Sequence, residues 1–326
     1  MEGNNLKNIW KLWLTSALAV FLLAACGGTA VEDKPETEKA PQEEASKEVE
    51  ELYPLTIKDA DDKEVTVEAA PATIVSLMPS NTEILFELGL AEEVIAVTEN
   101  DDYPAEVEEK ESVGGFELNI EKIISLNPEM VFAHEMLLGS SGEGLEQIRD
   151  AGIPVIVVDN AEDFEETYAT IEMIGQVTDK VDEANKIIEG MKAQVEEVIE
   201  KTSKAEKERT VFVETSDAPI YTPGSGTFVQ EMLDMIGAKN MVAEEGWIMI
   251  DPEEIVNENP DVIVVMYNAP DIVQSVKNRA GFDTVTAVTD NMVIQVDENS
   301  TSRTGPRLAD GLEEFAKAIY PEAFSE

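Results

Sequence analysis

Two glutamates, Glu121 and Glu253, occupy matching places in a motif that the chain contains twice. Residues 119–132 return at an offset of 132 as residues 251–264. In each copy a helix-capping residue stands two positions before the glutamate, and an Asn-Pro pair and an apolar run follow, which predicts a short helix leading into a buried strand. A carboxylate at the start of a helix is stabilised by the helix dipole, and it can also form charge-assisted bonds with a cation on another protein. The repeat therefore predicts two similar lobes with one such acid on each.

The only cysteine, Cys26, directly follows an apolar stretch, residues 12–25, that Lys7 and Lys11 precede. A basic start, an apolar segment too short for a stable membrane span and small residues before the cleavage point are typical of a secretory signal. We interpret residues 1–25 as a lipoprotein signal peptide and Cys26 as the lipidation site. Buried acyl chains would then anchor the protein on the extracytoplasmic face of the cell membrane.

The segment after the cysteine is strongly charged. Residues 31–51 contain nine acidic residues, three lysines and two prolines. Because such a segment buries too little apolar surface to offset its ordering entropy, we expect a disordered acidic tether over residues 26–51. The rest of the chain is long enough for two lobes. We assign the N-terminal lobe to residues 52–178, a bridging helix to 179–207 and the C-terminal lobe to 208–326.

The composition excludes several functions. The 69 acidic and 23 basic residues give a formal net charge of −46, which would repel nucleic acid. The sequence contains no phosphate-binding loop, Ser-His-Asp set or metal motif, so we expect neither an enzyme nor a resident cofactor. His134 is the only histidine. We expect it to have a structural or cleft-lining role, with axial coordination of a bound cobalt or haem iron as the alternative.

Strands and helices alternate along both halves of the chain, which predicts an α/β fold with parallel sheets covered by helices. Within residues 179–207 the apolar side chains recur at steps of three and four, so they form one stripe on a helix of about 40 Å, long enough to bridge two lobes. Outside the repeated unit, the expected strands are 64–68, 73–77, 94–98, 155–159, 210–214 and 292–296, and the expected helices are 82–88, 145–151, 228–236 and 307–320.

Four motifs carry a family resemblance: residues 74–83 (IVSLMPSNTE), 102–104 (DYP), 113–121 (VGGFELNIE) and 127–131 (NPEMV). In this order they resemble the cobalamin and ferric-siderophore class of ABC-transporter substrate-binding proteins, over residues 74–318. The PSNTE block and Trp247, six residues before Glu253, make the cobalamin-binding members the most similar. The resemblance implies the class III periplasmic binding protein fold, with two α/β lobes, one rigid bridging helix, a shallow cleft and a small hinge motion.

The resemblance also implies partners. In this family one glutamate per lobe pairs with arginines of the membrane permease, a role that it gives to Glu121 and Glu253. The implied partners are the permease and ATPase of an ABC importer, a macrocyclic ligand and the membrane. We expect a monomer that captures a corrinoid such as cobalamin. A ferric siderophore or haem is the alternative ligand, and a surface receptor or adhesin without a transporter is a second alternative.

The candidate ligand contacts fall at strand ends or in the loops that follow, where open α/β sheets bind their ligands. Trp247 could instead belong to the core, and Arg303 could form a surface salt bridge. The absence of a basic cluster favours a neutral or zwitterionic ligand. The chain departs from the cobalamin-binding pattern at Asn100 and Gly115, where that pattern has aromatic residues. The full candidate set is Ser80, Asn100, Phe116, His134, Tyr221, Trp247, Tyr267 and Arg303.

Overall fold

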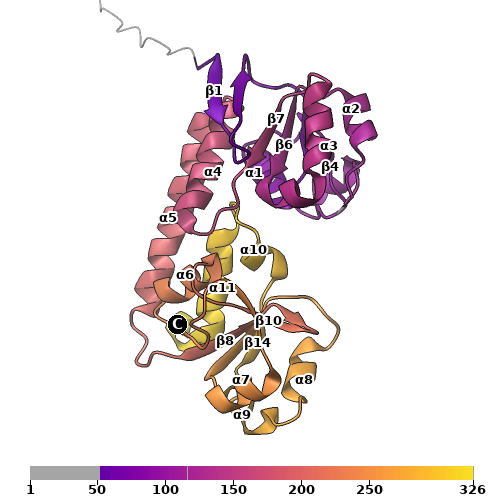
Figure 1. Cartoon of the computed structure of the whole chain (residues 1–326). Coiled ribbons are helices and arrows are strands. Elements are labelled where there is room, and N and C mark those ends of the chain that lie inside the picture. The colour runs from indigo at the N-terminus through magenta and orange to yellow at the C-terminus, as the bar shows by residue number, and fades with distance from the viewer. Residues whose placement is uncertain (1–51, 116, 326) are drawn as a thin grey trace, which may run out of the picture. The chain divides into compact units, whose positions relative to one another are not determined.

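The computed structural model describes residues 52–115 and 117–325, which form two α/β lobes, each built on a parallel sheet (Figure 1). The expected signal peptide, the lipidation site Cys26, the tether and Phe116 lie outside the described residues. The N-terminal sheet has the strand order β5-β4-β3-β6-β7, and the C-terminal sheet has the order β11-β8-β13-β14. The strands are β3 (Ile74–Ser76), β4 (Val94–Val97), β5 (Glu111–Ser112), β6 (Met130–His134), β7 (Val155–Val158), β8 (Thr210–Glu214), β11 (Lys239–Asn240), β13 (Val262–Val265) and β14 (Val293–Gln295).

The two sheets share one topology. Once β5 is set aside, the four remaining strands of each sheet lie in the chain order second, first, third, fourth, and every pairing is parallel. The strands β3 and β8 are equivalent in this arrangement, as are β6 and β13. The prediction of two α/β lobes with parallel sheets is therefore confirmed.

The repeated motif folds in the same way in both lobes. It forms α2 (Ile120–Leu126) before β6 and α7 (Pro252–Glu258) before β13. Both helices end at an asparagine in the left-handed conformation, Asn127 with φ 46° and Asn259 with φ 51°. Asparagine tolerates this conformation, and the proline that follows each one disfavours a further helical residue. The Asn-Pro pair therefore ends the helix and starts the turn into the strand.

The central strands are buried on both faces, as parallel strands covered by helices must be. In β6, Val131 and Ala133 face the core cluster beneath α2, while Met130 and Phe132 face a second cluster on the opposite side. In β13, Ile263 and Val265 face an outer cluster, while Val262 and Val264 face the inner one. Successive side chains of a strand point to opposite faces, so each sheet packs against its own outer core on one face and against an inner core on the other.

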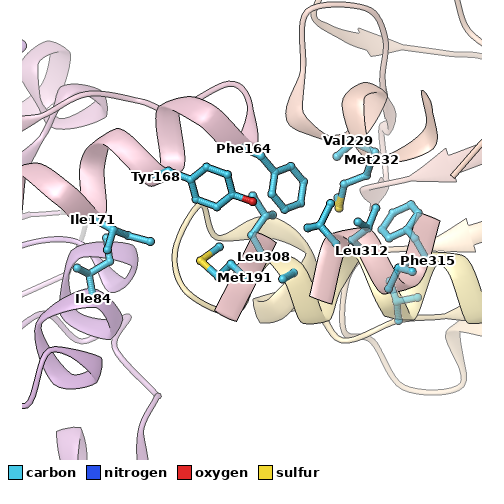
Figure 2. Packing of buried hydrophobic residues seen from close by; sticks show 14 of the residues in the cluster. Ile84, Phe164, Tyr168, Ile171, Met191, Val229, Met232, Leu308, Leu312 and Phe315 are labelled. Carbon is cyan, nitrogen blue, oxygen red and sulfur yellow. The ribbon is translucent and has the colours of Figure 1, made fainter. Parts of the chain in front are cut away.

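The inner core is continuous between the lobes. It joins α1 (Pro79–Glu87), α4 (Phe164–Val177), α5 (Val181–Thr202), α6 (Phe228–Met235) and α11 (Leu308–Ile319) into one apolar cluster. Figure 2 shows part of it, from Ile84 and Ile171 on one side to Met232 and Phe315 on the other. The helix α5 packs against α4 and α11, so it bridges the lobes.

Several elements differ from the sequence-based prediction. The bridging helix is shorter than residues 179–207, because Asp179 has a positive φ of 56° before α5 begins and a turn follows Ser203. The helix α4, capped by Asp163, was not predicted, nor was an antiparallel sheet of β9 (Ser216–Asp217), β10 (Ile220–Pro223) and β12 (Trp247–Met249).

The remaining elements are β1 (Leu55–Lys58), β2 (Glu64–Val67), α3 (Leu138–Asp150), α8 (Ile272–Lys277), α9 (Thr286–Thr289), α10 (Glu298–Ser302) and the 3₁₀ turns Ala105–Glu109, Glu135–Leu137, Phe282–Thr284 and Pro321–Phe324.

A pair of helical glycines tests the packing of the C-terminal lobe. A Cβ on Gly311 of α11 would lie 2.3 Å from the backbone oxygen of Ser300 in α10, whereas a Cβ on Gly190 of α5 would meet nothing within 4 Å. We expect Gly311→Ala to lower the free energy of unfolding by about 2 kcal/mol through overpacking. Gly190→Ala, the matched control, should raise it by roughly 0.5–1 kcal/mol. Urea denaturation measures both, and equal effects of the two substitutions would contradict the packing.

His134 ends β6 and is only 3% exposed. Burial in apolar surroundings lowers the pKa of its imidazole to about 4, although the nearby Glu135 opposes the shift. Its Nδ1 accepts a hydrogen bond from the backbone N–H of Met136 at 3.2 Å. The folded protein therefore holds this imidazole neutral, with its proton on Nε2.

This burial predicts a pH dependence of stability. Between about pH 6.5 and pH 4 the unfolded chain binds a proton at His134 and the folded chain does not, so acidification lowers the stability. At pH 5 the loss should reach about 2 kcal/mol. We expect His134→Met to lack this component, since the repeat places the buried Met266 at the equivalent position. Urea titrations of both proteins at pH 7.5 and pH 5 measure the difference, and parallel losses in the two would refute it.

Candidate functional site

The paired acids lie at equivalent places on the outer faces of the lobes. In α2 and α7 the buried residues Ile123 and Ile255 anchor the helices on the outer cores. Glu121 and Glu253 precede them by two positions, about 200° around the helix, and both are exposed. Asn119 caps α2 by accepting the backbone N–H of Lys122 at 3.0 Å, whereas Asp251 makes no such side-chain bond. Neither glutamate forms an ion pair within the described residues.

A buried carboxylate joins the two lobes. Glu83, in α1 of the N-terminal lobe, accepts hydrogen bonds from two arginines of the C-terminal lobe. Nη1 of Arg303 lies 2.8 Å from its Oε1, and Arg307 binds in a bidentate manner, with Nε 2.9 Å from Oε2 and Nη2 2.7 Å from Oε1. The Glu83 side chain is only 2% exposed. Since a buried carboxylate needs compensation, both guanidinium groups are required for its burial.

A second carboxylate completes this contact at its exposed rim. Asp102, in the loop after β4, accepts Nη1 of Arg303 at 2.7 Å and the side-chain amide of Asn299 at 2.8 Å. The neighbouring ring of Tyr103 lies 3.9 Å below the guanidinium carbon of Arg307, a cation–π distance. The loop after β4, the middle of α1 and the segment that contains α10 after β14 therefore meet here.

The electrostatics of this contact follow from its pairing. Burial works against the charge of Arg303, but its hydrogen bonds to Glu83 and Asp102 outweigh burial and raise its pKa. Burial likewise opposes ionisation of Asp102, but the hydrogen bonds from Arg303 and Asn299 hold its pKa below the ordinary value. In contrast, burial raises the pKa of the adjacent Asp101. The arginines and Asp102 are thus charged at neutral pH.

An exposed apolar surface extends from the end of β8. The strands β10 and β12 pair Tyr221 with Met249 and Pro223 with Trp247, so these residues lie on one face of the antiparallel sheet. Three of the side chains are exposed: Tyr221 by 38%, Trp247 by 50% and Met249 by 65%. We call Tyr221, Trp247 and Met249 the apolar platform. The indole of Trp247 is supported by Phe228 of α6, at 6.1 Å between ring centroids.

Beside the platform lies a second buried ion pair. Glu214, the fully buried last residue of β8, binds both terminal nitrogens of Arg279 at 2.5 Å and 2.6 Å. Arg279 also binds Asp217 at 2.6 Å, and the Tyr267 hydroxyl donates to Glu214 at 2.6 Å. Burial and the Glu214 carboxylate both raise the pKa of Tyr267. The hydroxyl proton of Tyr267 is therefore already donated to a carboxylate of the protein.

The structure brings only some of the predicted ligand residues together. Tyr221 and Trp247 share the platform, and the backbone oxygen of Asn100 lies 3.5 Å from Arg303. Ser80, in the first turn of α1, is buried beside Gly305. The His134 imidazole accepts a hydrogen bond from the backbone of Met136, and the Tyr267 hydroxyl donates one to Glu214. A core position for Trp247 is ruled out by its exposure. Ligand contact by these residues stays a prediction.

Some residues of the site were missed in the sequence. The motif at residues 74–83 contains Glu83, and the motif at 102–104 contains Asp102 and Tyr103, so the resemblance had marked them without giving them a role. Arg307 follows Arg303 by four positions, a spacing that can direct two cations to one acid. Met249 gave no signal, because its exposure depends on an antiparallel sheet that was not predicted.

Membrane-spanning helices and metal-binding clusters are both absent from the described residues. No helix between residues 52 and 325, apart from the undescribed position 116, is long and apolar enough to cross a membrane. The same residues contain no group of three or more histidine, cysteine or carboxylate side chains arranged to hold a metal ion.

Comparisons with known proteins agree with this architecture. The profile of a family described as periplasmic binding protein matches residues 74–300. The chain is 41% identical to the Bacillus subtilis (strain 168) protein named uncharacterized ABC transporter substrate-binding lipoprotein YvrC, over 97% of this chain and 98% of that protein. It is 26% identical to the vitamin B12-binding protein of Pectobacterium atrosepticum, over 74% of this chain and 85% of that protein.

A solved structure is similar as well. It is the structure of a possible iron-binding (periplasmic solute-binding) protein from Staphylococcus epidermidis, with a TM-score of 0.71 and 36% identity, covering 77% of this chain and 99% of that one. These relatives are solute-binding proteins and not enzymes, and what they bind is cargo and not a cofactor. The chain therefore belongs to the periplasmic binding protein family, has its class III fold and is the substrate-binding protein of an ABC transporter.

Proposed function

We propose that this protein binds a corrinoid at the carboxyl ends of its two sheets and delivers it to the permease and ATPase of an ABC importer. A lipid on Cys26 would hold it on the extracytoplasmic face of the membrane, with residues 26–51 as the tether, and it would act as a monomer. The observation that carries the ligand proposal is the apolar platform. Its three large side chains are exposed together, although an acidic protein gains nothing from an apolar patch unless a ligand covers it.

The chemistry of the platform suits a flat macrocycle. Indole and phenol rings bury large areas at low entropic cost, and the Met249 thioether adapts to an irregular surface. Three arginines toward the carboxyl ends of the sheets, Arg279, Arg303 and Arg307, are all bound to carboxylates, so they offer no free charge to an anionic ligand. The 26% identity to a vitamin B12-binding protein supports the same ligand class.

A ferric siderophore or haem is the second candidate. It is favoured by the 36% identity to a protein whose title describes it as possibly iron-binding. It is also favoured by Asn100 and Gly115, which lack the aromatic side chains of the cobalamin-binding pattern. The two candidates differ in charge and in colour, so they can be separated in one titration.

The ligand proposal is tested on the domain of residues 50–326, which is one compact unit and contains a single tryptophan, Trp247. We expect cyanocobalamin to quench its fluorescence saturably, with Kd at or below about 1 μM, because Trp247 is half exposed on the proposed contact surface. By calorimetry, Trp247→Ala should weaken binding about tenfold or more, and Trp247→Phe should weaken it less. Quenching by a ferric siderophore or haem but not by cyanocobalamin would replace the first candidate by the second.

The docking role of the paired acids is tested by uptake. Glu121→Ala and Glu253→Ala should each reduce ligand uptake by cells about tenfold, since each removes one charge-assisted contact with the permease. The ligand affinity of the purified protein should stay within about twofold, because both acids lie on the outer faces of the lobes. Glu254→Ala is the matched control, since it removes an exposed acid one residue further along α7. Normal uptake in both variants would refute docking through these residues and favour a receptor without a transporter.

A further inference from the structure

Two carboxylates and two guanidinium groups pair with one another at the meeting point of the lobes. Glu83, Asp102, Arg303 and Arg307 form what we call the closed cluster, with two carboxylates and two guanidinium groups. Arg303 bridges both acids through one nitrogen, and Arg307 uses two nitrogens for Glu83 alone. Since each of the four groups has a partner of opposite charge within hydrogen-bond distance, neither guanidinium group offers an unpaired charge to a molecule beside it.

Burial is uneven within the closed cluster. The side chains of Glu83, Arg303 and Arg307 are 2%, 14% and 19% exposed, whereas that of Asp102 is 56% exposed. Asp102 is thus the carboxylate on the solvent side of Arg303. Its position is the one that the carboxylate of a ligand would have to take in order to reach this guanidinium group.

A third arginine, at the carboxyl end of β8, is also paired with carboxylates of the protein. Arg279 is 13% exposed and is bound by Glu214 and Asp217, beside the platform. Two separate arginine sites therefore both have their own carboxylates, in a protein whose acidic excess makes cations scarce. A site for an anion would leave such arginines open.

We propose that Asp102, supported by Glu83, sets the charge specificity of this binding protein by occupying the guanidinium group that would otherwise bind an anionic ligand. The inference rests on the proposed ligand site at the carboxyl ends of the sheets, and it adds the reason why that site rejects carboxylate-bearing molecules. Asp102 acts here as a built-in substitute for a ligand carboxylate.

The test is a gain of binding in Asp102→Asn. This change keeps the shape of the side chain and gives the cluster a net charge of +1. Because Asp102 is more than half exposed, loss of its charge should cost the fold little stability. The control is Glu108→Gln, which removes one exposed acid from the same lobe without contacting an arginine. The probes are ferric haem, a flat macrocycle with two propionates, and the neutral cyanocobalamin, titrated at low and high salt.

We expect Asp102→Asn to bind haem about tenfold more tightly than the wild-type protein or the control, with most of the gain lost at high salt. An unchanged haem affinity, including no detectable binding in any of the proteins, would overturn the proposal. An equal gain for cyanocobalamin, or a gain that persists at high salt, would also overturn it, since the effect would not depend on charge. Binding of cyanocobalamin by the wild-type protein separately decides the proposed function.

Discussion

The apolar stripe of α5 is the constraint on which the rest of the structure depends. It packs against α4 of one lobe and α11 of the other, so the two sheets share an inner core although each has an outer core of its own. This shared core fixes the lobes closely enough for Glu83 to reach Arg303, which is 220 positions away in the chain. Buried ion pairs contribute little net stability, so the apolar core supplies the free energy and the ion pair defines the contact between the loops.

The scarcity of cations shapes the chemistry of the site. With a net charge of −46, the protein has a surface on which any exposed arginine would find a carboxylate nearby. The arginines near the carboxyl ends of the sheets are instead paired with acids of the same protein, and this leaves the apolar platform as the surface that we propose for ligand contact. Binding on such a surface depends on buried area and ring contacts, which salt screens weakly.

Local patterns predicted most strands and helices of the parallel sheets well, and they failed for elements that depend on pairing between distant segments. The bounds of α2, β6 and β8 agree with the sequence because a cap, a left-handed asparagine or a short apolar run specifies each of them. The sheet of β9, β10 and β12 was missed because its strands have two to four residues and are held by pairing between distant segments. The partners of Arg303 were missed for the same reason, since no local signal shows which acid a folded chain brings to a cation.

Duplication and divergence then account for the two surfaces of the protein. The repeated unit places α2 and α7 on equivalent outer faces, each anchored by an isoleucine and each presenting one acid, so a partner that recognises both lobes can use one chemistry twice. The platform has no counterpart among the described residues of the N-terminal lobe, where β3 leads directly into α1. Under the proposed function, the repeated elements contact the permease and the inserted ones contact the ligand. If β10 and β12 contact the ligand as proposed, substitutions there can change the ligand without disturbing α2 and α7, the helices that carry Glu121 and Glu253.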